Sequence, residues 1–392
     1  MTKVQEPLFN TKLECPICKT ANEFEIVKQG AYTESGRDTD FMPTGRMWTN
    51  PAYQKYDPLL YFAATCKFCF YTRELNAEFK EWQNDTNFKS YKLPGQAKKH
   101  LEESKSPGSV ITMLGGKLDP KHYPFESAVI KLLLTVYDEK LLEHPSPLDL
   151  ARFFLRMAWL YRDNADQVGN TKSAEMMLNV IQMEINRLKK DVDGFEIHIP
   201  PLNRAISKDL SLVVDANKTV GISSKLIPAI NNIQKVWDDL KYNSELLQQE
   251  FSKVAMEINL LKPDLTGDGK FWEYAGFREF LYAVKEKWNE VPVNETEALS
   301  FALNYYLKAY QSSREIKAGL QQLQAAYLIA ELSRRVNDLP QAREYFKTAN
   351  KMAQELMAKN RNDKTVFSNA QKIFEMSLEQ GRVVKNAAMV SA

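Results

Sequence analysis

The sequence AAYLIAELSRRVNDLPQAREYFKTA, at residues 325–349, describes two amphipathic helices joined by a short turn. Ala330 lies twelve positions before Ala342, the offset expected between the first and second helices of one helical repeat. Asn337 stands where such turns usually carry glycine, and asparagine tolerates a left-handed backbone. This stretch therefore predicts a pair of helices that pack through small side chains.

The same arrangement of small and aromatic residues occurs twice near the C-terminus. The two triplets, 40 positions apart, are Ala302, Tyr306, Ala309 and Ala342, Phe346, Ala349. An offset of 40 exceeds the tetratricopeptide period of about 34 residues, which a longer helix or loop around 312–319 explains. Helical periodicity also runs through 120–190. We therefore expect a solenoid of tetratricopeptide-like helices at 120–190 and 293–392.

The composition indicates a folded, mainly α protein. The 392 residues are 44% hydrophobic, and glycine and proline are few, at 15 and 17. Against 50 acidic residues the 52 basic ones leave a net charge of +2, too small for a surface devoted to nucleic acid. No apolar run reaches the roughly 18 residues of a membrane span, and the first residues contain no secretion signal. We therefore expect a cytoplasmic protein without a membrane span.

All four cysteines lie in two C-x-x-C pairs, Cys15 with Cys18 and Cys66 with Cys69. Two such turns can place four thiolates around one ion, so the pattern predicts a structural Zn²⁺ site in a zinc-ribbon-like β module. The pairs are separated by 47 residues, more than the usual 15–20, which indicates an insertion. Four thiolates leave no open position for substrate, so we expect no catalytic zinc. A redox dithiol remains the alternative.

The insertion between the pairs is rich in turn residues and ends in a predicted strand at 60–65. Arg37, Asp38 and Asp40 form a candidate recognition cluster, since a guanidinium and two carboxylates suit a polar ligand. Alternatively, these side chains pair with one another or cap turns around the metal site. The sequence leaves both interpretations open.

Several motifs in this region resemble a known family. They are C-P-x-C, R-D-T-D-F at 37–41, N-P-x-Y at 50–53 and the second C-x-x-C. Together they cover about residues 10–75 and resemble the bacterial family named domain of unknown function 2225. The resemblance implies an N-terminal zinc module followed by tetratricopeptide-like helices, and it implies no activity. Lys19 and Phe70 depart from it, because zinc knuckles usually carry glycine there, and Lys67 stands where the family usually has proline.

A long heptad pattern lies between the two helical regions. Apolar residues step by four and three over 36 positions, with one polar interruption at Ser244. The apolar positions are Leu226, Ile230, Ile233, Trp237, Leu240, Leu247, Phe251, Val254, Ile258 and Leu261. A helix of this length, about 54 Å, needs a partner helix along its side. That partner is either within the chain, at 204–222 or 271–288, or on another chain in a coiled coil.

Other motifs carry less chemistry. The loop Asp264–Gly269 resembles the first half of a calcium loop, but Ala275 stands where calcium needs a carboxylate, so calcium binding is left open. The four histidines show no relay pattern, and we expect most of them at the surface. Lys98, Lys99 and His100 are expected to form a short charged run in a linker.

These observations favour a non-enzymatic scaffold for protein assembly, with self-association or hetero-assembly through the heptad helix and the repeat groove. The alternatives are a zinc-ribbon adaptor of a nucleic-acid machine and, third, an enzyme that acts at the R-D-T-D loop. The expected domains are a zinc module at 1–110, helices at 120–190, an insertion at 191–292 with the long helix 226–261, and helices at 293–392.

Overall fold

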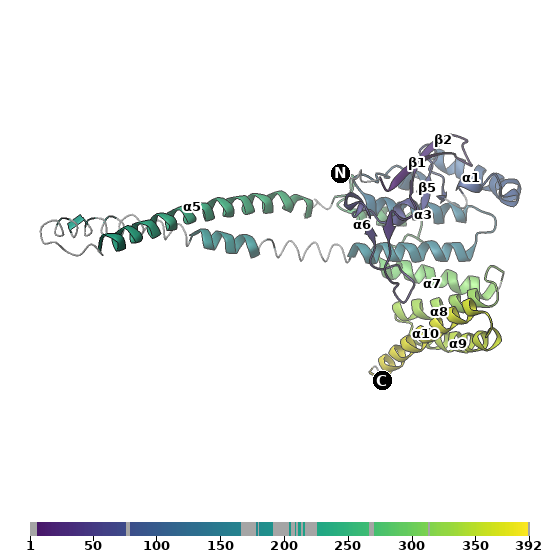
Figure 1. Ribbon diagram of the computed structural model, residues 1–392. Coiled ribbons are helices and arrows are strands. Elements are labelled where there is room, and N and C mark those ends of the chain that lie inside the picture. The colour runs from purple at the N-terminus through teal and green to yellow at the C-terminus, as the bar shows by residue number, and fades with distance from the viewer. Residues whose placement is uncertain are drawn as a thin grey trace. The chain divides into compact units, whose positions relative to one another are not determined.

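The computed structural model describes residues 6–75, 79–165, 180–190, 226–265, 270–312 and 314–390, with a few single positions between 178 and 215 (Figure 1). The chain divides into two compact units, residues 1–165 with 270–392, and residues 166–269. The described parts are mainly helical, as predicted, and their named strands form small two-stranded sheets near the N-terminus. Residues 270–292, which the sequence analysis grouped with the insertion, belong to the first unit. The other predicted domain boundaries stay predictions.

Three antiparallel sheets of two strands each make up the N-terminal module. They are β1 (Leu8–Glu14) with β2 (Ala21–Val27), β3 (Tyr32–Thr33) with β4 (Met47–Trp48), and β5 (Ala63–Thr65) with β6 (Thr72–Glu74). The β1–β2 and β5–β6 hairpins each carry one C-x-x-C pair in the turn. The two cysteine pairs are therefore held by equivalent pieces of local structure.

Two short 3₁₀ helices, η1 (Pro51–Tyr53) and η2 (Pro58–Tyr61), connect the second and third sheets. Asn50 begins η1 by accepting a hydrogen bond from the backbone N–H of Ala52, and Tyr53 packs on Trp48, which accounts for the N-P-x-Y motif. The strand predicted at 60–65 is shorter than expected and covers Ala63–Thr65. Its first half is helical because Asp57 caps η2.

Helices from both sides of the insertion belong to the first unit. They are the π-helix η4 (Phe88–Lys92), α1 (Leu93–Lys105), α2 (Val110–Gly115), α3 (Pro124–Lys140), a helix over 147–165, α6 (Phe277–Lys285) and α7 (Glu295–Ser312). The buried apolar residues of α3 and of 147–165 lie in one cluster with those of α6 and α7. Leu60 of η2 belongs to the same cluster and is 1% exposed, so the N-terminal module packs directly on the helices.

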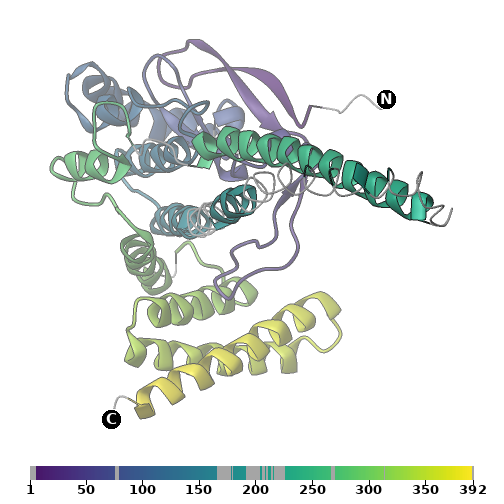
Figure 2. The same cartoon turned by 90° about the vertical axis from the view of Figure 1, so that its left-hand side faces the viewer.

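Helices α8 (Leu320–Arg335), α9 (Leu339–Lys359) and α10 (Lys364–Val390) complete the first unit, and each packs on the preceding helix (Figure 1, Figure 2). The turn between α8 and α9 places Asn337 at φ 66°, which confirms the left-handed backbone predicted there. The alanines of both triplets are fully buried, as are Ala326, Ala330, Ala353 and Ala370. Small side chains therefore line the contacts between these helices, while their assignment as tetratricopeptide repeats stays a prediction.

In the second unit, α5 (Leu226–Leu265) includes the whole predicted heptad helix. The side chains of six of its ten predicted assembly residues lie outside the described part of the chain. They are Leu226, Ile230, Ile233, Trp237, Ile258 and Leu261. Most of the partner helix considered at 204–222 and most of the loop Asp264–Gly269 also lie outside the described residues. Among the residues that the structure describes, no helix is long and apolar enough to cross a membrane.

Candidate metal centre

Each C-x-x-C pair sits in a tight turn closed by backbone hydrogen bonds. In the first turn the N–H of Cys15 donates to the carbonyl of Thr20 and that of Lys19 to the carbonyl of Cys15. The second turn repeats this pattern, with bonds from Cys66 to Tyr71 and from Phe70 to Cys66. The repeated geometry brings the two thiols of each pair to the same side of the turn.

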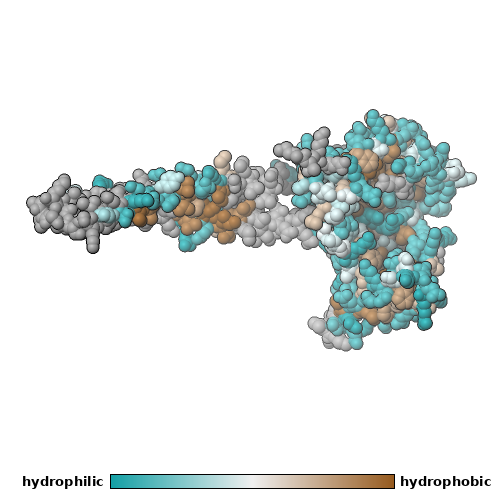
Figure 3. All heavy atoms as spheres, viewed as in Figure 1, coloured by the Kyte–Doolittle hydropathy of each residue, from teal (hydrophilic) through white to brown (hydrophobic). Residues whose placement is uncertain are grey.

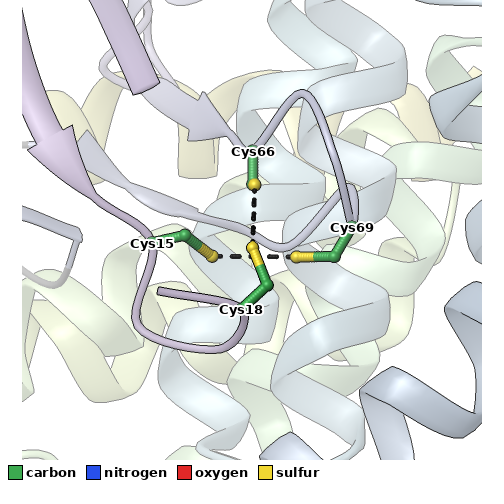
Figure 4. Close-up of side chains that lie close together, drawn as sticks. All are labelled: Cys15, Cys18, Cys66 and Cys69. Atoms are coloured by element: carbon green, nitrogen blue, oxygen red, sulfur yellow. Dashed lines mark hydrogen bonds between the residues drawn. The ribbon is translucent and has the colours of Figure 1, made fainter. Parts of the chain in front are cut away.

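The four sulfur atoms converge from these two turns (Figure 4). The Sγ atoms of Cys15 and Cys69 are 3.7 Å apart, those of Cys18 and Cys66 are 3.5 Å apart, and all four lie within 4.8 Å of one another. A tetrahedral Zn²⁺ with bonds of about 2.3 Å places its sulfurs about 3.8 Å apart. The predicted ligands are thus in a position to hold a metal ion, and their spacing fits zinc.

Asn22 of β2 supports the sulfur cluster from outside. Its side-chain amide donates to Sγ of Cys66 over 3.4 Å, while its carbonyl oxygen accepts the backbone N–H of Lys67 over 2.9 Å. Since Asn22 is 4% exposed, it ties the first hairpin to the second turn within the protein interior. Such an outer partner orients a ligand and favours its thiolate form.

Crowding shifts the pKa values of three of these thiols in different directions. Hydrogen bonds from Cys15 and Cys69 lower the pKa of the Cys66 thiol, while the hydrogen bond to Cys66 and burial raise the pKa of Cys15. The pKa of Cys69 is raised by its hydrogen bonds to Cys15 and Cys66 and by burial. A bound cation favours the thiolate form of all four cysteines. Zinc would therefore balance the charge of the neighbouring sulfurs and hold the two hairpins together.

The two residues that replace glycine in the turns adopt the expected glycine-like backbone, with φ 60° at Lys19 and φ 63° at Phe70. Side-chain contacts accompany both: Lys19 donates from Nζ to the carbonyl of Pro16 and lies 3.9 Å above the ring of Trp82. The ring of Phe70 occupies the space beside Gly115, where an added Cβ would come within 2.1 Å of it. The knuckle geometry is therefore kept despite the departures.

A buried polar network joins the second turn to the helices. His100 of α1 places Nδ1 2.6 Å from Asp138 Oδ1 and Nε2 2.8 Å from the carbonyl oxygen of Cys69. The other oxygen of Asp138 accepts the N–H of Thr72 over 2.7 Å. Burial would lower the pKa of His100, but the charge and hydrogen bond of Asp138 outweigh it and raise that pKa. The second C-x-x-C turn is thus linked to α1 and α3.

This network corrects one sequence-based expectation, because His100 lies with Lys98 and Lys99 inside α1, not in a linker. His100 is fully buried, whereas His122 and His144 are exposed, so most of the histidines that the structure describes lie at the surface, as expected. The sequence could have predicted the burial of His100, because Leu93, Gln96 and His100 follow helical spacing and form the buried face of α1. A second buried pair, Arg73 with Glu139, connects β6 to the end of α3 beside the network.

The R-D-T-D-F loop is held by arginines of distant helices. Asp40, fully buried, pairs with Arg162 of the helix 147–165 at 2.8 Å. Asp38 accepts hydrogen bonds from Arg162 over 2.9 Å and from Arg335 of α8 over 2.8 Å. Burial opposes the charge of Asp38, but the Thr39 N–H and Arg335 outweigh it, so its pKa is lowered.

Thr39 and Phe41 extend these contacts toward α8. The backbone carbonyl of Thr39 accepts a hydrogen bond from the Tyr327 hydroxyl over 2.8 Å. The side-chain hydroxyl of Thr39 donates to the carboxylate of Glu331. Phe41, with φ 65°, turns its ring onto Tyr327 at 5.5 Å between centroids. The loop is therefore a structural connection between the N-terminal module and the C-terminal helices.

The predicted site residues thus divide into two groups. The four cysteines come together, whereas Arg37, Asp38 and Asp40 do not form one cluster: Arg37 is exposed and the two aspartates point to helical arginines. Of the alternatives left open by the sequence, pairing among the three is replaced by pairing with Arg162 and Arg335, while Asp38 and Asp40 do accept backbone N–H groups within the loop. A recognition role for them stays a prediction.

The fold and the cysteine cluster define a zinc-ribbon-like module joined to a helical body. A family model described as "Uncharacterized protein conserved in bacteria (DUF2225)" matches residues 8–197 and 277–381. The chain therefore belongs to this family, as its motifs predicted. No curated protein and no solved structure matches the chain.

Proposed function

We propose that the chain is a non-enzymatic scaffold, in which a structural zinc ion stabilises the N-terminal module and α5 binds a helical protein partner. Four sulfurs complete a tetrahedral site, which supports a structural role for the metal. Both carboxylates of the R-D-T-D loop are engaged by arginines, which supports a structural role for that loop too. The four thiols suit the reducing cytoplasm.

The observation that carries the assembly role is a row of exposed apolar residues on α5. Leu240, Leu247 and Val254 lie seven residues apart and are 37%, 48% and 38% exposed. On the neighbouring row Ser244 is 8% exposed and Phe251 is half-buried. Hydrophobic surface gathers on part of the second unit (Figure 3). One side of the heptad seam is thus covered, while the other side is open to a partner.

The open row fits an amphipathic helix better than a small molecule. Its three residues share one heptad position, so they follow a line along the helix instead of lining a hollow. A second helix packed there would bury all three side chains along its own apolar stripe. A second copy of α5 carries the same stripe, so self-association is the simplest version of the proposal.

Light scattering of the zinc-loaded protein tests this version. We expect an oligomer at micromolar concentration, and Leu240→Asp with Leu247→Asp should dissociate it, because carboxylates in an apolar seam lose hydration without gaining a partner. A matched pair, Tyr242→Asp with Met256→Asp, changes residues that are 65% and 66% exposed on a different row of the same helix, and should leave the oligomer intact. A monomeric wild-type protein would contradict self-association.

A second candidate function rests on the tip of the second metal-binding turn. Phe68 is 67% exposed there, next to the exposed Lys67. An exposed aromatic ring beside a cation suits stacking on a nucleic-acid base, which supports the alternative of a nucleic-acid adaptor. Salt-dependent binding of single-stranded RNA in a shift assay, weakened by Phe68→Ala with the zinc content unchanged, would favour this alternative.

A further inference from the structure

A cavity of about 500 Å³ opens in the first unit, a volume in the usual range for small-molecule sites. Its walls come from the β1–β2 hairpin, η2, β5, the second metal-binding turn, and helices α2 and α3. The apolar part of its lining includes Leu60, Ala63 and Ala64. The cavity is lined by residues of the first unit, whereas α5 belongs to the second, so the inference does not depend on the proposed assembly role of α5.

The charged groups that line the cavity are two acidic and two basic side chains. Glu23 and Glu25 are exposed residues of β2, and Lys67 is exposed on the metal-binding turn. Lys131, in the middle of α3, is the fourth. These four side-chain charges sum to zero, and Cys66, which also lines the cavity, would belong to a zinc centre of net charge −2. The cavity as a whole therefore disfavours a highly charged anion.

Lys131 differs from the other three because its ammonium group lies against the protein interior. Its Nζ donates to the carbonyl of Leu60 over 2.7 Å, and within the described part of the chain it forms no ion pair with a carboxylate. Burial lowers the pKa of Lys131 to about 8, with a weaker opposing effect of Glu25. The amine is therefore mostly charged at neutral pH and has two further hydrogens to donate.

We propose that this cavity binds a small amphipathic carboxylate, whose carboxylate accepts hydrogen bonds from Lys131 and whose apolar part lies on Leu60, Ala63 and Ala64. A largely desolvated ammonium group with no carboxylate in hydrogen-bond contact has lost hydration without gaining an ionic partner, and a bound monoanion supplies that partner. The two glutamates oppose a doubly charged phosphate, for which a single ammonium is also a poor set of donors. The apolar part of the lining accommodates a short alkyl chain or a ring.

Calorimetric titration of the full-length, zinc-loaded protein with sodium octanoate tests the proposal, with 1-octanol as the neutral probe. We expect saturable octanoate binding that Lys131→Met weakens by about tenfold or more, since a charged hydrogen bond is lost. Binding of 1-octanol should be weaker and should not change in this variant. Lys287→Met, at an exposed lysine of the same unit, is the matched control and should bind octanoate as the wild type does.

Leu118→Trp provides a second measurement, because Leu118 lines the cavity and a larger ring would fill it. It should abolish octanoate binding while the zinc content stays at the wild-type level. The proposal is overturned if wild-type protein binds no octanoate at millimolar concentration, or if Lys131→Met or Leu118→Trp binds it as tightly as the wild type. Displacement of octanoate by equal concentrations of inorganic phosphate would also overturn the carboxylate assignment.

Discussion

The N-terminal module and the helices α8, α9 and α10 achieve burial by different means. The module has small sheets and depends on a sulfur cluster and on buried charged pairs, such as Arg73 with Glu139. The C-terminal helices instead pack through alanines that are fully buried, with Tyr327 and Phe346 between them. Stability is thus concentrated in a few contacts in the first region and spread over many in the second.

This difference has a physical consequence for substitutions. Loss of one metal ligand or one partner of a buried ion pair leaves a charge or a coordination site unsatisfied, which costs several kcal/mol. Loss of fit at one alanine changes only the packing of nearby side chains. Single changes should therefore damage the N-terminal module more than the C-terminal helices.

The largest loss of stability is expected from Cys66→Ser. Wild-type protein should contain one zinc per chain, whereas the variant should lose it and with it the folding energy of the module, because zinc binding and folding are coupled. Metal analysis and thermal unfolding check this. Phe68→Ala, between two ligands in the same turn, is the control and should keep its zinc. A wild-type module that is folded without metal would contradict the prediction.

The next largest loss of stability is expected from Arg162→Met, which removes the closer of two guanidinium groups at the fully buried Asp40 and leaves only Arg335, whose Nε is 3.9 Å away. We expect a loss of about 3 kcal/mol in the free energy of unfolding. Arg152→Met, which removes an exposed pair with Asp149, should cost less than about 1 kcal/mol. Urea denaturation measures both, and equal losses in the two variants would show that the loop does not depend on its buried charges.

A smaller loss of stability is expected from Gly115→Ala, because the new methyl group would overlap the ring of Phe70. Displacing this ring in the second C-x-x-C turn should cost about 1–3 kcal/mol. Gly95→Ala is the control, since a Cβ at Gly95 meets nothing within 4 Å and alanine favours the helix. Thermal unfolding should show a lower melting temperature for the first variant, and an unchanged one would mean that Phe70 moves at no cost.

A loss of stability at the lower end of the same range is expected from Ala342→Leu. The larger side chain at a fully buried position would push the neighbouring helices apart. About 1–3 kcal/mol is typical for such overpacking. Ala358→Leu, at an exposed position of the same helix, should change stability by less than about 0.5 kcal/mol. Similar denaturation midpoints for the two variants would contradict the close approach of α8, α9 and α10.

The features that the sequence predicted correctly are local ones. The cysteine pairs indicated their own turns, and Asn337 and the buried alanines followed from spacing within one or two helices. The partners of Asp38 could not be predicted in this way, since Arg162 and Arg335 lie 124 and 297 positions further along the chain. No periodicity connects residues that only the tertiary fold brings together.

The metal site was predictable in its ligands and not in its surroundings. Four cysteines in two pairs admit few arrangements, whereas the polar residues around them are common types without a distinctive spacing. Asn22 and Asp138 belong to this second group, as each is recognisable only from its contacts with the turns. His100 was the exception, because helical spacing alone could have placed it on the buried face of α1.

The contacts of the R-D-T-D-F loop also bear on how the chain is made. The hydrogen bonds from Tyr327 to Thr39 and from Arg335 to Asp38 span 288 and 297 positions. At about 5–20 residues per second, a ribosome adds that length in roughly 15 to 60 seconds. During this time the loop is exposed without its final partners. The N-terminus is synthesised first, but part of it reaches its native contacts only when the C-terminal helices have left the ribosome.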